Sequence, residues 1–105
     1  MSKDILTAKK TVETEIEALK KLRSSFNGSS QFSKAVNLLD KMKGKCLVVG
    51  VGKSYIIGLK VSSTLASLSI PSVAFSANDL QHGGLGAIQK NHDCLLVFSV
   101  SGESS

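Results

Sequence analysis

A short apolar run that ends in two glycines, a lysine and a serine constrains this chain more than any other feature. It reads KCLVVGVGKS over residues 45–54, and apolar residues then recur at every third or fourth position, at Ile57, Val61, Leu65 and Leu68. The run is too short for a buried helix and is rich in β-branched residues, which is typical of a central parallel strand covered on both faces. The sequence therefore predicts a strand, a tight glycine turn and a helix, in that order.

The rest of the chain extends this alternation of strands and helices. Pro71 ends the helix, and the apolar segments at residues 72–75 and 93–100 are predicted to be further strands, joined by a glycine-rich connection over residues 76–88. Ahead of the first strand, apolar stripes predict one helix over residues 3–25 and a second helix after it. The predicted order α-α-β-α-β-loop-β is typical of an α/β fold with a parallel sheet and right-handed crossovers.

Composition and charge narrow the classes of partner. The net charge is +5 at pH 7, but the lysines alternate with apolar residues at helical spacing and have no aromatic residues among them. A solvated helix face is favoured over a nucleic-acid surface, so no nucleic-acid partner is expected. No apolar run approaches the roughly 18 residues of a membrane-spanning helix, and charges occupy the N-terminal positions that are apolar in a signal peptide. We therefore expect a cytoplasmic protein without a membrane contact.

The two cysteines, Cys46 and Cys94, both lie in strand-like apolar runs. They are predicted to be buried and reduced thiols, because too few other ligands lie nearby for a metal site.

The glycine turn fits neither of the common nucleotide-binding loops. A P-loop needs a further glycine at position 47, which is Leu47, and a dinucleotide fingerprint needs one at position 55, which is Tyr55. Two interpretations remain. The segment is either an ordinary tight turn with a solvated lysine, or an anion site in which Lys53 projects over the strand ends and Ser54 caps the helix or meets the anion.

A second polar loop follows the last predicted strand. The segment SVSGESS places Ser99, Ser101, Ser104 and Ser105 around Gly102. Strand-end hydroxyls, backbone N–H groups and a helix dipole together can cradle a phosphate, and a serine-rich helix cap is the alternative. Ligands of parallel sheets bind at the carboxyl ends of the strands. Both loops follow strands, so the site is predicted at that edge of the sheet.

Three segments in this order, GVGKS, HGGLG and SVSGESS, resemble the sugar isomerase (SIS) domain, and most closely its arabinose-5-phosphate isomerase branch. The resemblance implies a three-layer α/β/α fold around a parallel sheet, truncated here to about three strands and preceded by two N-terminal helices. It predicts a helical segment over residues 1–43 and the first half of a phosphosugar-binding domain over residues 44–105.

The resemblance also implies site residues and a reaction. The phosphosugar would contact Gly52, Ser54, Ser99, Ser101, Gly102 and Ser104. Lys53 would stabilise the oxyanion of an aldose–ketose shift, His82 would handle protons or ligate a metal, and Glu103 is the carboxylate left at the second loop. A loop histidine that bonds to the backbone is the alternative for His82. The branch interconverts ribulose 5-phosphate and arabinose 5-phosphate for lipopolysaccharide biosynthesis, and no cofactor is implied.

The chain departs from the branch at several points. Gly84 replaces an aspartate, Tyr55 and Ile56 put bulk beside Lys53, and the sequence stops at Ser105, before further acid and base residues of the branch. We therefore expect little or no isomerisation by the chain alone. The alternatives are a phosphosugar-sensing or regulatory module without turnover, and a remnant that self-associates. A homo-oligomer is expected, formed through the strand at residues 93–100 or through helices packed across its faces, with the first helix also contributing.

Overall fold

The computed structural model describes residues 2–28, 30–81, 86 and 88–99. The chain divides into two compact units, Met1–Val36 and Asn37–Ser105. Within the described residues, no helix combines the length and the apolar character needed to cross a membrane.

The first unit contains helix α1, Lys3–Ser25, and the start of helix α2, Ser30–Lys41. The side chain of Ser2 caps α1 by accepting a hydrogen bond from the Ile5 N–H at 3.3 Å, which satisfies one of the donors that a helix start leaves open. The predicted apolar stripe is present, but its members are 45–63% exposed, and α1 buries no residue. These members are Ile5, Val12, Ile16, Leu19 and Leu22.

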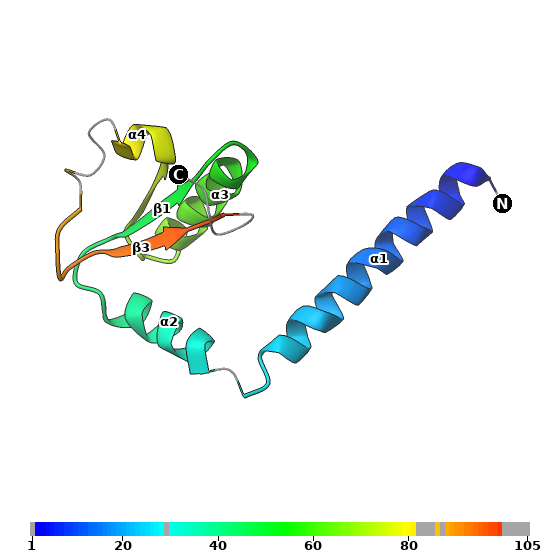
Figure 1. Ribbon diagram of the computed structural model, residues 1–105, viewed down its shortest axis with the longest axis horizontal. Coiled ribbons are helices and arrows are strands. Elements are labelled where there is room, and N and C mark those ends of the chain that lie inside the picture. Colours follow the sequence, from blue (N-terminus) through cyan, green and yellow to red (C-terminus); the bar gives the residue numbers. More distant parts are fainter. Residues whose placement is uncertain (1, 29, 82–85, 87, 100–105) are drawn as a thin grey trace. The chain divides into compact units, whose positions relative to one another are not determined.

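The second unit is built on a parallel sheet of three strands in the order β2-β1-β3. The strands are β1, Cys46–Gly50, β2, Ser72–Ser76, and β3, Cys94–Val97, and Figure 1 shows β1 between the other two. The prediction of an α/β fold with the first strand in the middle of a parallel sheet is confirmed.

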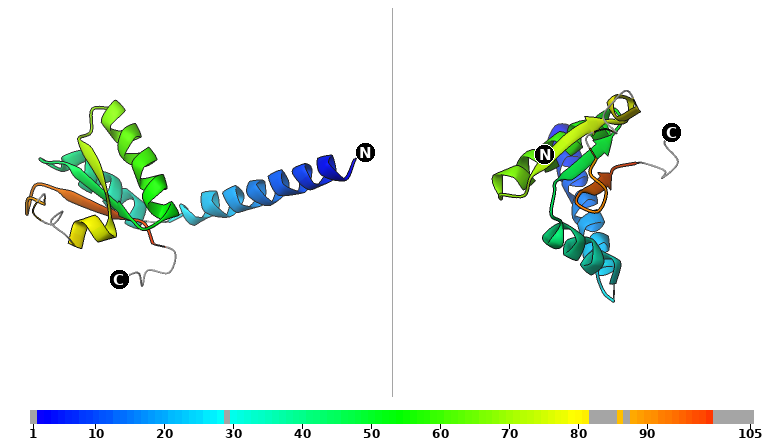
Figure 2. Two further views of the ribbon diagram at one scale, coloured as in Figure 1. Left: turned by 90° about the horizontal axis from the view of Figure 1, so that it is seen from above. Right: turned by 90° about the vertical axis from the view of Figure 1, so that its left-hand side faces the viewer.

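Helix α3, Lys53–Ser67, covers one face of β1 and β2, and Figure 2 shows it lying along the strands. Its buried Gly58 brings the helix close to the sheet, since an added Cβ there would lie 3.1 Å from Cγ1 of Val48. Leu47 and Val49 point to the opposite face and are also buried. The prediction of a central strand covered on both faces is therefore confirmed.

Two predicted segments differ from the structure. The connection after β2 was predicted to be a glycine-rich loop, but it begins with a short helix, α4, Ala77–Gln81. The Oγ of Ser76 accepts a hydrogen bond from the Asp79 N–H at 3.1 Å, which starts this helix. The third strand begins at Cys94 and not at residue 93, because Asp93 is used as a hydrogen-bond acceptor in front of it. The strand ends at Val97, and the predicted end at Val100 lies outside the described residues.

Strand β3 forms one edge of the described sheet and is covered unevenly. Cys94 and Leu96 are half-buried, whereas Leu95 and Val97, on the other face, are 52% and 57% exposed. The Cys94 face is partly covered, because Cys94 contacts α2 there.

The carboxylate of Asp93 holds the start of β3 against the start of β1. It accepts hydrogen bonds from the N–H groups of Lys45 and Gln89, both at 2.8 Å, and from Nζ of Lys45 at 3.0 Å. The Asp93 side chain is only 2% exposed. The bonds from the Lys45 and Gln89 backbones, followed by the Lys45 ammonium, lower the pKa of Asp93 to about 2. A Cβ on the neighbouring Gly44 would collide with this carboxylate, so glycine is needed there.

Candidate functional site

The turn between β1 and α3 is built by two glycines with different roles. Gly52 has φ of +58° and precedes the helix, in a backbone region that side chains other than glycine rarely adopt. Gly50 has no room for a side chain, since an added Cβ would lie 2.6 Å from the carbonyl carbon of Ser54 and 2.8 Å from the Tyr55 nitrogen. The strand therefore passes directly beneath the first turn of the helix.

Hydrogen bonds in this turn decide which groups face a ligand. The Ser54 N–H donates to the Val51 carbonyl at 3.1 Å, and the Tyr55 N–H donates to the Gly52 carbonyl at 3.1 Å. These two N–H groups are therefore already used by the backbone. An anion at this turn can meet the half-buried hydroxyl of Ser54 and the exposed ammonium of Lys53, at the positive end of the α3 dipole.

Ser99 lies at the same edge of the sheet as this turn. The Phe98 N–H donates to the Val49 carbonyl at 2.9 Å, which continues the ladder one residue beyond the last residue of β3. The register pairs Val49 with Val97, so Ser99 comes level with Val51. The structure thus brings Ser99 together with the Gly52, Lys53 and Ser54 turn, although these segments are far apart in the sequence.

The other predicted site residues fall on parts of the chain outside the described residues. These are His82, Ser101, Gly102, Glu103 and Ser104. Among the residues that the structure describes, no group of three or more His, Cys, Asp or Glu side chains could hold a metal ion. The predictions of proton handling or metal binding by His82 stay predictions.

Ser76 is a residue at this edge that sequence reasoning missed. It ends β2, pairs in register with Gly50 of β1, and caps α4 through its hydroxyl. The signal that could have found it is a serine directly after an apolar strand and three residues before Asp79, which is a spacing typical of helix caps.

The chemistry available from the described part of the edge is that of anion binding. Lys53 supplies a cation, Ser54 and Ser99 supply hydroxyl groups, and α3 adds the positive end of its dipole. His92 lies at the opposite end of the strands, is exposed, and contacts the Lys90 carbonyl through Nδ1 at 3.1 Å.

Comparison with known proteins finds a matching family and several similar proteins. Residues 38–105 match the SIS domain family. The chain is 35% identical over 100 residues to arabinose 5-phosphate isomerase KpsF of Escherichia coli O6:H1 strain CFT073, covering 95% of this chain and 30% of that protein. It is 36% identical over 108 residues to arabinose 5-phosphate isomerase KdsD of Francisella tularensis subsp. tularensis, covering 100% of this chain and 32% of that protein.

The fold of the chain also matches that of a solved structure. The E. coli CFT073 protein in complex with arabinose 5-phosphate superposes with a TM-score of 0.81 at 30% identity, covering 99% of this chain and 55% of that one. The chain thus spans about a third of the length of the curated relatives and about half of this solved relative.

Proposed function

The chain belongs to the SIS domain family, and from that premise we propose that it binds the phosphate group of a phosphosugar at the carboxyl edge of its sheet. One observation carries the proposal: the register of β1 and β3 brings Ser99 to the turn that presents Lys53 and Ser54. A solved relative in complex with arabinose 5-phosphate and relatives named arabinose 5-phosphate isomerases support a pentose 5-phosphate as the ligand.

The reaction that we propose for this lineage is the interconversion of ribulose 5-phosphate and arabinose 5-phosphate. Such a shift needs a base that moves a proton between adjacent carbons and a cation that stabilises the developing oxyanion. Lys53 suits the second role. His82 and Glu103 are our candidates for proton transfer, and Ser101, Gly102 and Ser104 for further phosphate contacts. We propose further that this reaction takes place in the cytoplasm and that its product feeds the synthesis of a sugar acid of lipopolysaccharide.

We propose that these 105 residues alone bind the phosphosugar without appreciable turnover. Among the described residues, the turn after β1 and the end of β3 offer a cation and hydroxyls, and neither segment carries a carboxylate or an imidazole. The second candidate function, a phosphosugar-sensing module, rests on the same arrangement. Appreciable turnover would favour the isomerase over the sensing module, because general acid–base help typically contributes about 10²–10⁴-fold to the rate.

We also propose that the chain forms a homo-oligomer, with α1 pairing against α1 of a second copy. The exposed stripe of α1 is flanked by Glu13 and Lys20, which lie on one side of it at 100° per residue. An antiparallel pair centred between Ile16 and Glu17 sets each Glu13 opposite the partner's Lys20. The same register inserts Leu19 of one copy between Val12 and Ile16 of the other. The exposed Leu95 and Val97 of β3 offer a further apolar surface for association.

The phosphate site is tested by titrating arabinose 5-phosphate into the chain and into two serine variants. Ser54→Ala removes the hydroxyl at the start of α3, whereas Ser63→Ala makes the same change at an exposed position farther along that helix. A hydrogen bond to a charged group contributes about 1.5–3 kcal/mol, so Ser54→Ala is expected to weaken binding by about ten- to a hundredfold. Ser63→Ala is expected to bind as the parent does. Equal affinities in all three proteins would contradict the proposed site.

A coupled isomerase assay on the same samples addresses turnover separately. We expect no conversion of arabinose 5-phosphate above the background rate. Conversion within about tenfold of a full-length relative, well inside the range that acid–base help contributes, would refute binding without turnover and leave the phosphate site standing.

A further inference from the structure

The two thiols of the chain lie side by side on adjacent strands. Cys46 of β1 and Cys94 of β3 are direct partners in the parallel register. Both face α3, because they share the alternation of Val48 and Phe98, which lie next to Gly58 of that helix. Neighbouring strands are about 4.8 Å apart, which falls within the range of about 4.4–6.8 Å between Cα atoms that a disulfide spans. Both cysteines are free thiols in the structure.

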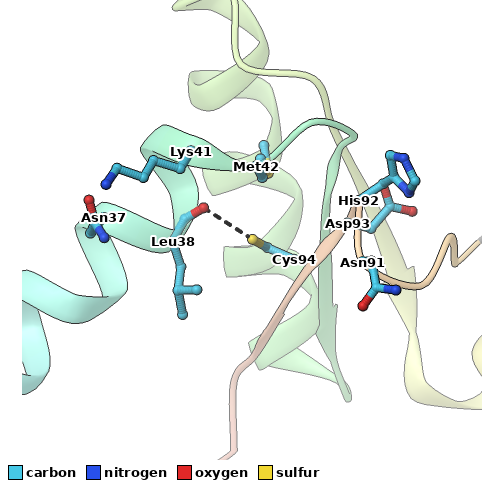
Figure 3. Close-up of a pocket in the computed structure, with 8 residues that line it drawn as sticks. All are labelled: Asn37, Leu38, Lys41, Met42, Asn91, His92, Asp93 and Cys94. Carbon is cyan, nitrogen blue, oxygen red and sulfur yellow. Dashed lines mark hydrogen bonds between the residues drawn. The ribbon is translucent and has the colours of Figure 1, made fainter.

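The two thiols differ in accessibility. Cys46 is fully buried, whereas Cys94 is half-buried and lines a hollow of about 300 Å³. Figure 3 shows the sulfur of Cys94 pointing toward the Leu38 carbonyl of α2, to which it donates a hydrogen bond at 3.5 Å. Asn37 and Lys41 line the hollow from α2, and Asn91 and His92 line it from the segment before β3. A small oxidant can therefore reach the Cys94 thiol through this hollow. Cys46 does not line the hollow and is fully buried, so the oxidant does not reach its thiol directly.

We propose that Cys94 and Cys46 form a peroxide-sensitive thiol pair that closes into an intrachain disulfide. A hydroperoxide oxidises the Cys94 thiol to a sulfenic acid and is itself reduced to an alcohol, or to water in the case of hydrogen peroxide. The Cys46 sulfur then attacks the Cys94 sulfur, a sulfur–sulfur bond forms, and the hydroxyl leaves as water with the Cys46 proton. Two thiols and one peroxide thus give one disulfide and, for hydrogen peroxide, two waters.

The environment of Cys46 sets the speed of the closing step. Burial, and then the neighbouring Cys94, raise the pKa of the Cys46 thiol. Since the thiolate is the attacking form, closure is slow at neutral pH and becomes faster as the pH rises toward the pKa of Cys46. Closure ties the start of the edge strand to the central strand and removes the hydrogen bond from Cys94 to α2.

The test uses the full 105-residue chain, reduced and then treated with hydrogen peroxide. Thiols are counted after unfolding, and the peptides are mapped by mass spectrometry. We expect both thiols to disappear together, a peptide link between Cys46 and Cys94 whose yield does not depend on protein concentration, and full recovery with dithiothreitol. A chain whose Cys94 becomes oxidised while Cys46 stays a free thiol, or one that links Cys94 only between two chains, would overturn the proposal.

Two single variants separate the steps. In Cys46→Ser the sulfenic acid on Cys94 has no partner, and dimedone is expected to trap it. In Cys94→Ser, Cys46 is expected to stay reduced, because it is fully buried. Equal peroxide reactivity of Cys46 in the parent and in Cys94→Ser would show that Cys94 is not the point of entry. Circular dichroism checks the fold of each variant, and the parent experiment decides the question even where a variant does not fold.

Discussion

Replacing Gly50 by alanine should destabilise the second unit, because the new side chain meets the backbone of α3. The new Cβ would lie 2.6 Å from the carbonyl carbon of Ser54, 2.8 Å from its oxygen and 2.8 Å from the Tyr55 nitrogen. Carbon atoms in contact normally stay about 3.5–4.0 Å apart, so the first turn of α3 must move by about 1 Å. The obstacle is backbone, which cannot turn aside as a side chain can. Such overpacking typically costs about 1–3 kcal/mol of the free energy of unfolding.

Thermal unfolding followed by circular dichroism measures this loss. For a domain of 60–100 residues, about 1 kcal/mol lowers Tm by about 4–8 °C, so Gly50→Ala should lower Tm by about 4 °C at least and by about 24 °C at most. Because the moved turn presents Lys53 and Ser54, the variant should also bind arabinose 5-phosphate more weakly. Hydrogen bonds lose most of their strength when their atoms separate by about 1 Å.

Two further glycines calibrate the experiment. A Cβ at Gly86 meets nothing within 4 Å, so Gly86→Ala should unfold at the temperature of the parent. A Cβ at Gly58 lies 3.1 Å from Cγ1 of Val48, a side chain that can adjust, so the loss there should be intermediate. If Gly50→Ala unfolds within about 1 °C of Gly86→Ala, well below the smallest expected loss, the close passage of the strand beneath α3 is refuted.

Two other predictions concern the clamp before β3, which is the set of hydrogen bonds from Lys45 and Gln89 to the Asp93 carboxylate, and the surface of α1. The pKa of Asp93 is lowered from 3.8 to about 2 on folding, so its contribution to stability is present above pH 4 and is lost as the pH falls toward 2. Asp93→Asn should therefore unfold at a lower temperature than the parent at pH 7, with the difference disappearing near pH 2, and a constant difference across this range would contradict the clamp. On α1, Leu19→Lys should shift the chain toward monomer in sedimentation velocity at micromolar concentration, while the outward-facing Lys21→Ala should not. An unchanged distribution in Leu19→Lys would exclude α1 as the pairing surface.

Several features of this fold were predictable because they depend on neighbours in the sequence. The spacing of Ile5 to Leu22 and the cap at Ser2 are local, and the helix at residues 3–25 has the predicted bounds. The continuous apolar run before Gly50 predicted a buried central strand, and β1 is buried along its whole length. The alternation of strands and helices predicted the parallel sheet, since a crossover helix returns each strand in the same direction.

The tertiary structure decided what depends on residues far apart in the chain. Asp93 and Lys45 are 48 positions apart, and no local pattern shows that this carboxylate holds the start of β3 instead of lying in a solvated strand end. The register of β3 beside β1 follows from such contacts, and it sets both the position of Ser99 next to the Gly52 turn and that of Cys94 next to Cys46. The sequence by itself determined which segments become helices and strands, because side-chain spacing acts over a few residues. Which strand ends and which thiols meet was decided only by packing, because a shift of one residue in the pairing would turn every side chain of β3 to the other face.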